Sequence, residues 1–151
     1  MKTLFIGIDP GKKGGIAYID TQDNVSITIP YSDTALIDLC RVASNDWNNE
    51  IVCCLEKVGA MPGQGVVSMF NFGQSVGYIK GVLESHRIPY QEITPQKWKR
   101  EFGLTSDKAA SAEVCRKLFP DIDLQATPRS KKPHDGMAEA LLMAEYARRK
   151  L

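Results

Sequence analysis

The spacing of apolar residues divides the chain into five expected strands and five expected helices. Continuous or alternating apolar runs predict strands, and apolar residues three and four apart predict helices. Strands that come first and then alternate with helices predict an α/β protein with a mixed five-stranded sheet covered by helices. The expected strands cover 3–9, 14–20, 24–30, 50–56 and 88–94, and the expected helices cover 32–46, 66–86, 95–103, 106–120 and 134–149.

Length and composition favour one cytosolic domain over residues 1–151. The chain has 151 residues, no internal repeat and no linker-like segment, and its 43% hydrophobic and 25% charged content exclude a disordered chain. No apolar run approaches the roughly 18–20 residues of a membrane span. The residues before Asp9 show no secretory signal pattern. Four cysteines without a CxxC pair indicate reduced core residues.

Charge is unevenly distributed along the chain. Residues 1–96 carry 7 Lys and Arg against 10 Asp and Glu, a net of −3, whereas residues 97–151 carry 12 against 8, a net of +4. The basic half is compatible with a polyanionic partner and equally with an ordinary solvated surface.

Four carboxylates occupy positions where they can converge. Asp9 and Glu56 each end an apolar strand, and adjacent strands would bring these ends together. Asp135 and Glu139 are four residues apart in the last expected helix, so they share one face of it. Because that face continues through apolar residues, we expect it to face the sheet.

A cluster of four acids needs compensating charge. Two unit charges 4 Å apart repel by about 4 kcal/mol at an effective dielectric of 20, so protons or cations must accompany them. An all-oxygen ligand set suits Mg²⁺ or Mn²⁺. Two such ions can activate a water and stabilise the leaving oxygen of a phosphodiester.

Each acid also has a structural interpretation without chemistry. Asp9 begins an Asp-Pro-Gly sequence that is typical of turns, Glu56 would suit a strand end that meets solvent, and Asp135 would suit a helix cap. A capping box would place Glu or Gln at position 138, which is Ala, so capping does not account for Glu139. His134 is a further candidate metal ligand and equally a surface residue.

Five segments, in order over nearly the whole chain, point to a known family. They read GIDPGKKGGIAYI, LEKV, FNFGQSVGYIKGVL, TPQKWKREFGL with DKAASAEVCRKLFP, and HDGMAEALLMAEY. They resemble the RuvC Holliday-junction resolvases of the RNase H-like (retroviral integrase) superfamily, specifically the small bacteriophage-type members. The resemblance implies an RNase H-like fold with sheet order 3-2-1-4-5. It also implies Mg²⁺-dependent, symmetrical nicking of four-way DNA junctions by a homodimer, in a bacterial or phage-infected cytoplasm.

By position, the resemblance assigns Asp9 and Glu56 to the family's first two metal-binding acids and Glu139 to the last. Asp135 takes the place of the third acid, with a difference in spacing. The cellular enzymes place their two helix acids three residues apart, and here the position three before Glu139 is Gly136. Spacings of three and four both keep two side chains on one helix face, so we expect Asp135 to complete the site.

The resemblance also assigns lysines to the DNA. Lys97 and Lys108, eleven residues apart, match lysines that approach the scissile phosphate and the backbone, and a compact ammonium suits a phosphate. Each lysine would also suit a solvated helix face. Four further lysines flank the expected catalytic loops and are candidates for more distant phosphates: Lys12, Lys13, Lys131 and Lys132.

Two other segments bear on partners. Cellular resolvases carry an aromatic residue three positions after the second acid, where it stacks on bases, but here that position is Gly59. Stacking on a base contributes roughly 1–3 kcal/mol, so its loss would loosen the substrate preference. The helix over 66–86, with Phe70, Phe72 and glycines every fourth residue, is the expected dimer interface, although the same residues would suit an intramolecular core.

We therefore expect a metal-dependent endonuclease for branched DNA, without a small-molecule cofactor. Its four acids would hold two Mg²⁺ ions, with Mn²⁺ as a substitute. A broader substrate range of flaps, Y-forks and replication branches stays open. An ATPase of the actin and sugar-kinase type also opens with Asp-x-Gly after a strand, but it needs two such domains. A non-catalytic DNA-binding module would have no need of the four acids.

Overall fold

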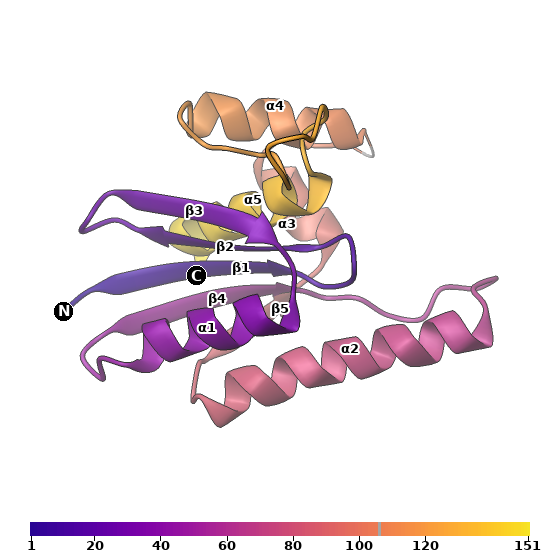
Figure 1. Ribbon diagram of the computed structural model, residues 1–151, viewed down its shortest axis with the longest axis horizontal. Helices are drawn as coiled ribbons and strands as arrows, with labels where there is room; N and C mark the ends of the chain where they lie inside the picture. Colours follow the sequence, from indigo (N-terminus) through magenta and orange to yellow (C-terminus); the bar gives the residue numbers. More distant parts are fainter. Residues whose placement is uncertain (106) are drawn as a thin grey trace.

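The computed structural model describes residues 1–105 and 107–151, with the backbone but not the side chain of Lys108, and its elements follow the expected order (Figure 1). The expected helix over 106–120 begins at Lys108, and Ser106 lies outside the described residues. The strands are β1 (Thr3–Asp9), β2 (Gly15–Asp20), β3 (Val25–Pro30), β4 (Glu50–Glu56) and β5 (Tyr90–Ile93). The helices are α1 (Asp33–Ser44), α2 (Val66–Ser85), α3 (Pro95–Glu101), α4 (Lys108–Leu118) and α5 (Asp135–Lys150).

The five strands form one mixed sheet in the order β3-β2-β1-β4-β5, which confirms the expected fold class and strand order. β1 pairs antiparallel with β2 and parallel with β4, at the centre of the sheet. In the β1–β4 register Ile8 is paired with Leu55, so the next residue of each strand, Asp9 and Glu56, emerges at the same edge.

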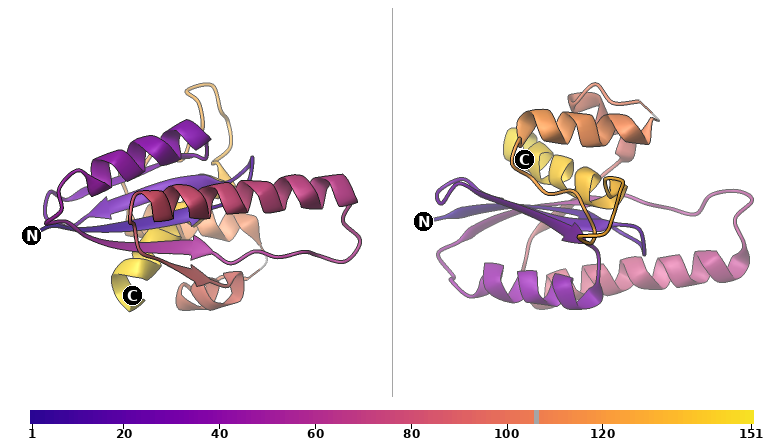
Figure 2. Two further views of the ribbon diagram at one scale, coloured as in Figure 1. Left: turned by 90° about the horizontal axis from the view of Figure 1, so that it is seen from below. Right: turned by 45° about the horizontal axis from the view of Figure 1, so that its top comes forward.

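Helices cover both faces of the sheet in two layers (Figure 2). On one face, α1 and α2 pack on alternate residues of the central strands, such as Ile6 and Leu55. On the other face, α5 lies across the sheet with α3 and α4 outside it, and its buried residues form the larger part of a second core cluster. This arrangement brings the last helix over the strand that begins the fold.

Glycines allow α5 to lie unusually close to the sheet. A Cβ built on Gly7 in β1 would lie 2.0 Å from the Ala140 carbonyl oxygen, and one built on Gly15 would lie 2.2 Å from the Gly136 oxygen. Conversely, a Cβ on Gly136 would lie 2.2 Å from the Lys13 oxygen. Any side chain at these positions would push α5 away from β1 and β2 and widen the distance between the acids.

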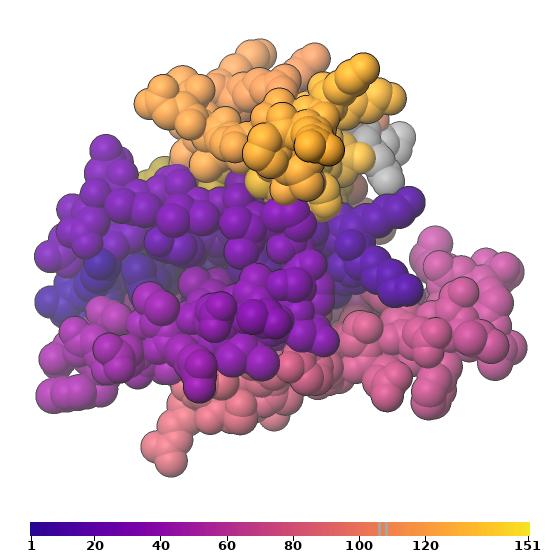
Figure 3. All heavy atoms as spheres, in the orientation of Figure 1, coloured from indigo at the N-terminus to yellow at the C-terminus, as the bar shows by residue number. Residues whose placement is uncertain are grey.

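α2 carries two faces of different composition. Ile79 and Leu83 are buried against the sheet, whereas the N-terminal half of the helix extends past the end of the strands (Figures 1 and 2). In the space-filling view this half forms a projecting lobe (Figure 3). On the lobe Val66, Val67 and Phe70 are 85%, 73% and 71% exposed. The helix thus presents an apolar surface that the rest of the described chain does not cover.

The remaining expectations about the chain as a whole concern membranes and cysteines. Among the helices of the described residues, none is long and apolar enough to cross a membrane. All four cysteines are free and buried, in agreement with the expectation of reduced core residues. Burial raises the pKa of the Cys54 thiol and of the Cys115 thiol to about 12, which keeps both protonated and unreactive.

Candidate metal centre

Three carboxylates meet at the C-terminal edge of the central strands. Asp9 ends β1, Glu56 ends β4, and Glu139 lies in the second turn of α5. One oxygen of each carboxylate lies within 4.8 Å of the others. The parallel pairing of β1 with β4 places the first two acids side by side, and the close packing of α5 on the glycines brings the third to them.

The cluster carries more negative charge than the protein around it compensates. Burial, and then the charges of Glu56 and Glu139, raise the pKa of Asp9 to about 9. Burial likewise raises the pKa of Glu56, while a hydrogen bond from Trp98 and the charge of Lys99 act in the opposite direction. Without a further cation, a proton is therefore held within the cluster at neutral pH.

Two residues that the sequence analysis did not assign contact the cluster from α3. The Trp98 indole Nε1 donates a hydrogen bond of 2.9 Å to Glu56 Oε2, and the Lys99 ammonium lies 3.8 Å from Glu139 Oε1. Lys97, the lysine that the resemblance assigns to this segment, is exposed on the same helix. In a helix of seven residues, periodicity alone does not show which of two lysines faces inward.

Asp135 is the expected ligand that lies outside the three-acid group. It is the first residue of α5 and its side chain is exposed. It lines a cavity of about 500 Å³ together with Asp9 and Glu139, so it faces the same space without joining the cluster. Of the two acids expected on the inward face of α5, Glu139 joins the cluster of the described residues, and the role of Asp135 as a ligand stays a prediction.

The N-cap of α5 is His134 and not Asp135, which is the first residue of the helix. The His134 Nδ1 accepts a hydrogen bond of 3.0 Å from the Met137 backbone N–H. A neutral imidazole that accepts at Nδ1 carries its proton on Nε2, so ligation of a metal by either nitrogen would disturb this arrangement. His134 as a ligand likewise stays a prediction.

The lysines expected to contact DNA lie on several different segments of the chain. Lys12 and Lys13 are exposed in the β1–β2 loop and line the same 500 Å³ cavity as Asp9 and Glu139. Lys131 and Lys132 are exposed in the loop before α5. Lys108 opens α4, and its side chain lies outside the described part of the chain.

The loop after Glu56 contains no aromatic residue, and Gly59 stands where the resemblance implies one. Gly59 is exposed, with no heavy atom within 4 Å of a Cβ built on it, and Met61 is 65% exposed in the same loop. Neither residue fills the place of a stacking aromatic ring on the protein side.

The donor set fits a divalent cation. Asp9, Glu56 and Glu139 offer only oxygen atoms, close enough for one ion to contact all three. The raised pKa of Asp9 has its cause partly in the other two carboxylates, and a divalent cation would remove that repulsion more effectively than the single ammonium of Lys99. Mg²⁺ and Mn²⁺ are the ions that such a set prefers.

Fold and site together define a protein with an RNase H-like sheet and an acidic cluster at the ends of its central strands. Two solved structures are similar over almost the whole chain. One is T. thermophilus RuvC in complex with a Holliday junction substrate, with 16% identity and a TM-score of 0.57, covering 98% of this chain and 96% of that chain. The other is Thermus thermophilus RuvC, with 17% identity and a TM-score of 0.56, covering 99% and 96%. The chain therefore has a RuvC-like fold.

Comparison of the sequence itself gives no further relative. No protein-family model matches the chain, and no curated protein matches it. The likeness to RuvC that the comparisons show is thus one of fold, at 16% and 17% sequence identity.

Proposed function

We propose that the protein is a divalent-metal-dependent DNA endonuclease that nicks four-way junctions. The observation that carries the proposal is the group of Asp9, Glu56 and Glu139, brought together by β1, β4 and α5 of a RuvC-like fold. One of the similar structures is a RuvC bound to a Holliday junction, which supports branched DNA as the substrate class.

The proposed roles of the residues follow from their places. Asp9, Glu56 and Glu139, with Asp135 as a fourth ligand, would hold two Mg²⁺ ions. When bound, these ions would supply Lewis acidity and stabilise the charge of the phosphoryl oxygens. The Lys99 ammonium, 3.8 Å from Glu139, is placed to offset the charge of the acids or of a phosphate beside them.

Exposed lysines support a nucleic acid as the partner. Lys12 and Lys13 share a cavity with the acids, so phosphates next to the scissile one would meet positive charge there. The other lysines proposed to contact more distant parts of the DNA are Lys97, Lys108, Lys131 and Lys132.

A homodimer formed through α2 would match the substrate. A four-way junction has approximate two-fold symmetry, and a C₂ dimer presents two equal sites to two strands. The exposed Val66, Val67 and Phe70 form an apolar surface of the kind that marks an interface. Gly73 and Gly77 continue this surface along the helix, and no heavy atom lies within 4 Å of a Cβ built on either, so a second helix can approach closely.

Phe70→Glu is expected to separate the dimer. Burial of an uncompensated carboxylate in place of an aromatic anchor will cost about 2 kcal/mol or more, which weakens association by about 30-fold. Analytical ultracentrifugation over a concentration series measures the change. Val42→Glu, at a residue of α1 with the same 71% exposure, is the matched control and will leave association unchanged. A wild-type protein that is monomeric at all concentrations would contradict the α2 interface.

Nicking of a synthetic four-way junction is the experiment that tests the function. In Mg²⁺ the junction is expected to be nicked at least about tenfold faster than a linear duplex of the same sequence, equivalent to about 1.4 kcal/mol of transition-state preference. Flap and Y-fork substrates with the same arms measure the breadth of that preference. Equal rates on junction and linear duplex would remove junction resolution from the proposal.

A further inference from the structure

The pairing of β5 with β4 determines where α3 begins, and so where Trp98 lies relative to Glu56. β5 pairs in parallel with β4 so that Ile93 lies opposite Glu56, and the Lys57 backbone N–H donates 2.8 Å to the Ile93 oxygen. Thr94 is the N-cap of α3, and its side chain accepts a hydrogen bond from the Lys97 backbone N–H. The strand that carries Glu56 therefore also sets where α3 begins and where Trp98 points.

The chemistry of this contact is specific. Trp98 is fully buried, and among the described residues its indole is the side-chain donor to the buried carboxylate of Glu56. An indole has one donor and no acceptor, so it contacts one oxygen of Glu56, Oε2, and does not occupy the other. Because the indole is neutral, it orients the carboxylate without repelling a cation. A lysine or arginine at this position would repel the cation.

Trp98 also organises the neighbouring positive charge. The Lys99 Nζ lies 5.5 Å from the centroid of the Trp98 ring and 3.8 Å from Glu139 Oε1. Two consecutive residues of α3 therefore contact two different acids: Trp98 contacts Glu56, and Lys99 lies beside Glu139. The ring face attracts the ammonium, and the ring edge donates to Glu56.

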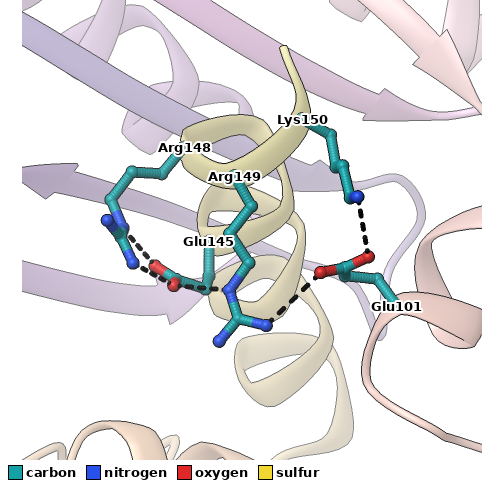
Figure 4. A network of polar contacts seen from close by, with 5 residues as sticks. All are labelled: Glu101, Glu145, Arg148, Arg149 and Lys150. Atoms are coloured by element: carbon teal, nitrogen blue, oxygen red, sulfur yellow. Dashed lines mark hydrogen bonds and ion pairs between the residues drawn. The ribbon is translucent and has the colours of Figure 1, made fainter.

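The rest of α3 is tied to the same helix that supplies Glu139. Figure 4 shows Glu101 of α3 between Arg149 and Lys150 of α5, each at 3.5 Å, while Arg149 also contacts Glu145. The Arg149 guanidinium lies 5.0 Å from the centroid of the Phe102 ring. This network holds the C-terminal end of α3 against α5, while the β4–β5 pairing fixes its N-terminal end.

We propose that Trp98 is a positioning residue for the metal centre, which orients Glu56 toward a divalent cation through its indole N–H. The inference rests on the proposed metal site and adds a residue that acts through Glu56 without contacting substrate. Loss of an outer partner of a metal-ligating carboxylate weakens metal affinity by about 10- to 100-fold. The Trp98→Phe protein, which retains an aromatic ring without the N–H, is expected to show a loss in that range.

The native tryptophans supply a direct readout. The chain contains Trp47, which is 89% exposed, and Trp98, so Trp98 is the only indole in a Trp47→Phe protein. Titration of that protein with Mg²⁺ is expected to shift the Trp98 emission to a saturating value. In a Trp47→Phe, Asp9→Asn protein, which keeps the indole and its partner, the shift will be absent. A change in packing alone would not produce a signal that saturates with metal.

Calorimetric titration with Mn²⁺ compares affinities in parallel. Trp98→Phe is expected to bind at least about tenfold more weakly than wild type, whereas Trp47→Phe will match it. Leu124→Ala truncates another buried residue of the same core cluster, and its unchanged affinity will separate orientation of Glu56 from general loosening of the core.

The outcomes separate the two proposals. Metal binding by wild type with a silent Trp98 emission and an unchanged affinity in Trp98→Phe would overturn the role of Trp98 and leave the metal site standing. Failure of wild type to bind either ion would overturn the metal site as well. Metal binding that depends on Trp98 without any nicking of DNA would support the role of Trp98 and overturn the nuclease.

Discussion

Exchange of Asp9 for Asn is expected to abolish nicking of a four-way junction and to leave junction binding intact. The amide is neutral and offers one oxygen, so the cluster loses a third of its charge and its ability to hold a cation. A loss of several kcal/mol of transition-state stabilisation lowers the nicking rate by at least about 10³-fold. Single-turnover nicking in Mg²⁺ measures the rate, and gel shift of uncleaved junction in Ca²⁺ measures binding.

Asp38→Asn is the matched control, because Asp38 is an exposed acid of α1, away from the cluster. It will nick at the wild-type rate. An Asp9→Asn protein that nicks within tenfold of wild type would remove Asp9 from the proposed site.

In the absence of metal, the same Asp9→Asn change is expected to stabilise the fold at alkaline pH. The pKa of Asp9 is raised from 3.8 to about 9 by burial and by Glu56 and Glu139, so the folded state binds this proton more tightly than the unfolded state. The free energy of unfolding therefore falls as the pH rises between these values, by up to about 1.4 kcal/mol per pH unit. Urea unfolding in EDTA at several pH values will show a smaller fall for Asp9→Asn. Parallel slopes in the two proteins would contradict the assigned repulsion.

Gly136→Asp is expected to destabilise the protein, although it would recreate the three-residue spacing of acids that the resemblance to RuvC implies. A Cβ at this position lies 2.2 Å from the Lys13 oxygen and 2.5 Å from a Gly14 backbone carbon. Backbone atoms cannot move aside as a flexible side chain does, so α5 would have to shift. We expect a loss of about 3 kcal/mol or more in the free energy of unfolding.

Gly136→Ala shows whether the cause is steric. In an unobstructed helix, Gly to Ala gains about 1 kcal/mol, so a loss here reverses the usual sign. Gly59→Ala, where nothing lies within 4 Å, is the control and will stay within about 0.5 kcal/mol of wild type. If Gly136→Asp were as stable as wild type and nicked faster, the proposed packing of α5 on the sheet would be wrong.

The acids whose places could be predicted from sequence are those set by local pattern. Asp9 and Glu56 end apolar runs, and parallel neighbours in an α/β sheet end at one edge, so their approach follows from the strand order. Glu139 follows from helical spacing with the buried Leu142 and Tyr146. In each case a few residues on either side determine where the side chain points.

The positions that sequence did not resolve depend on contacts between distant segments. Spacing allows Asp135 and Glu139 to share a face, but which turn of α5 reaches the sheet is set by Gly136 against Gly14 and Gly15. Similarly, Trp98 and Lys99 face the acids because the β4–β5 register fixes where α3 starts. The resemblance assigns Lys97 to the DNA, which stays a prediction, whereas the contact of Lys99 with Glu139 is visible only in the structure.

The cluster joins Asp9 in the first strand to Glu139 in the last helix, two residues that are 130 positions apart in the chain. α5 supplies much of one core cluster as well as Glu139. Undocking of that helix would therefore expose the core and separate Glu139 from the other two acids at the same time. A partly folded chain in which α5 is undocked therefore lacks the cluster. For the proposed nuclease, a nascent chain would therefore be unable to cut nucleic acid until α5 had been synthesised and packed. Folding of the last helix would then control when the activity appears.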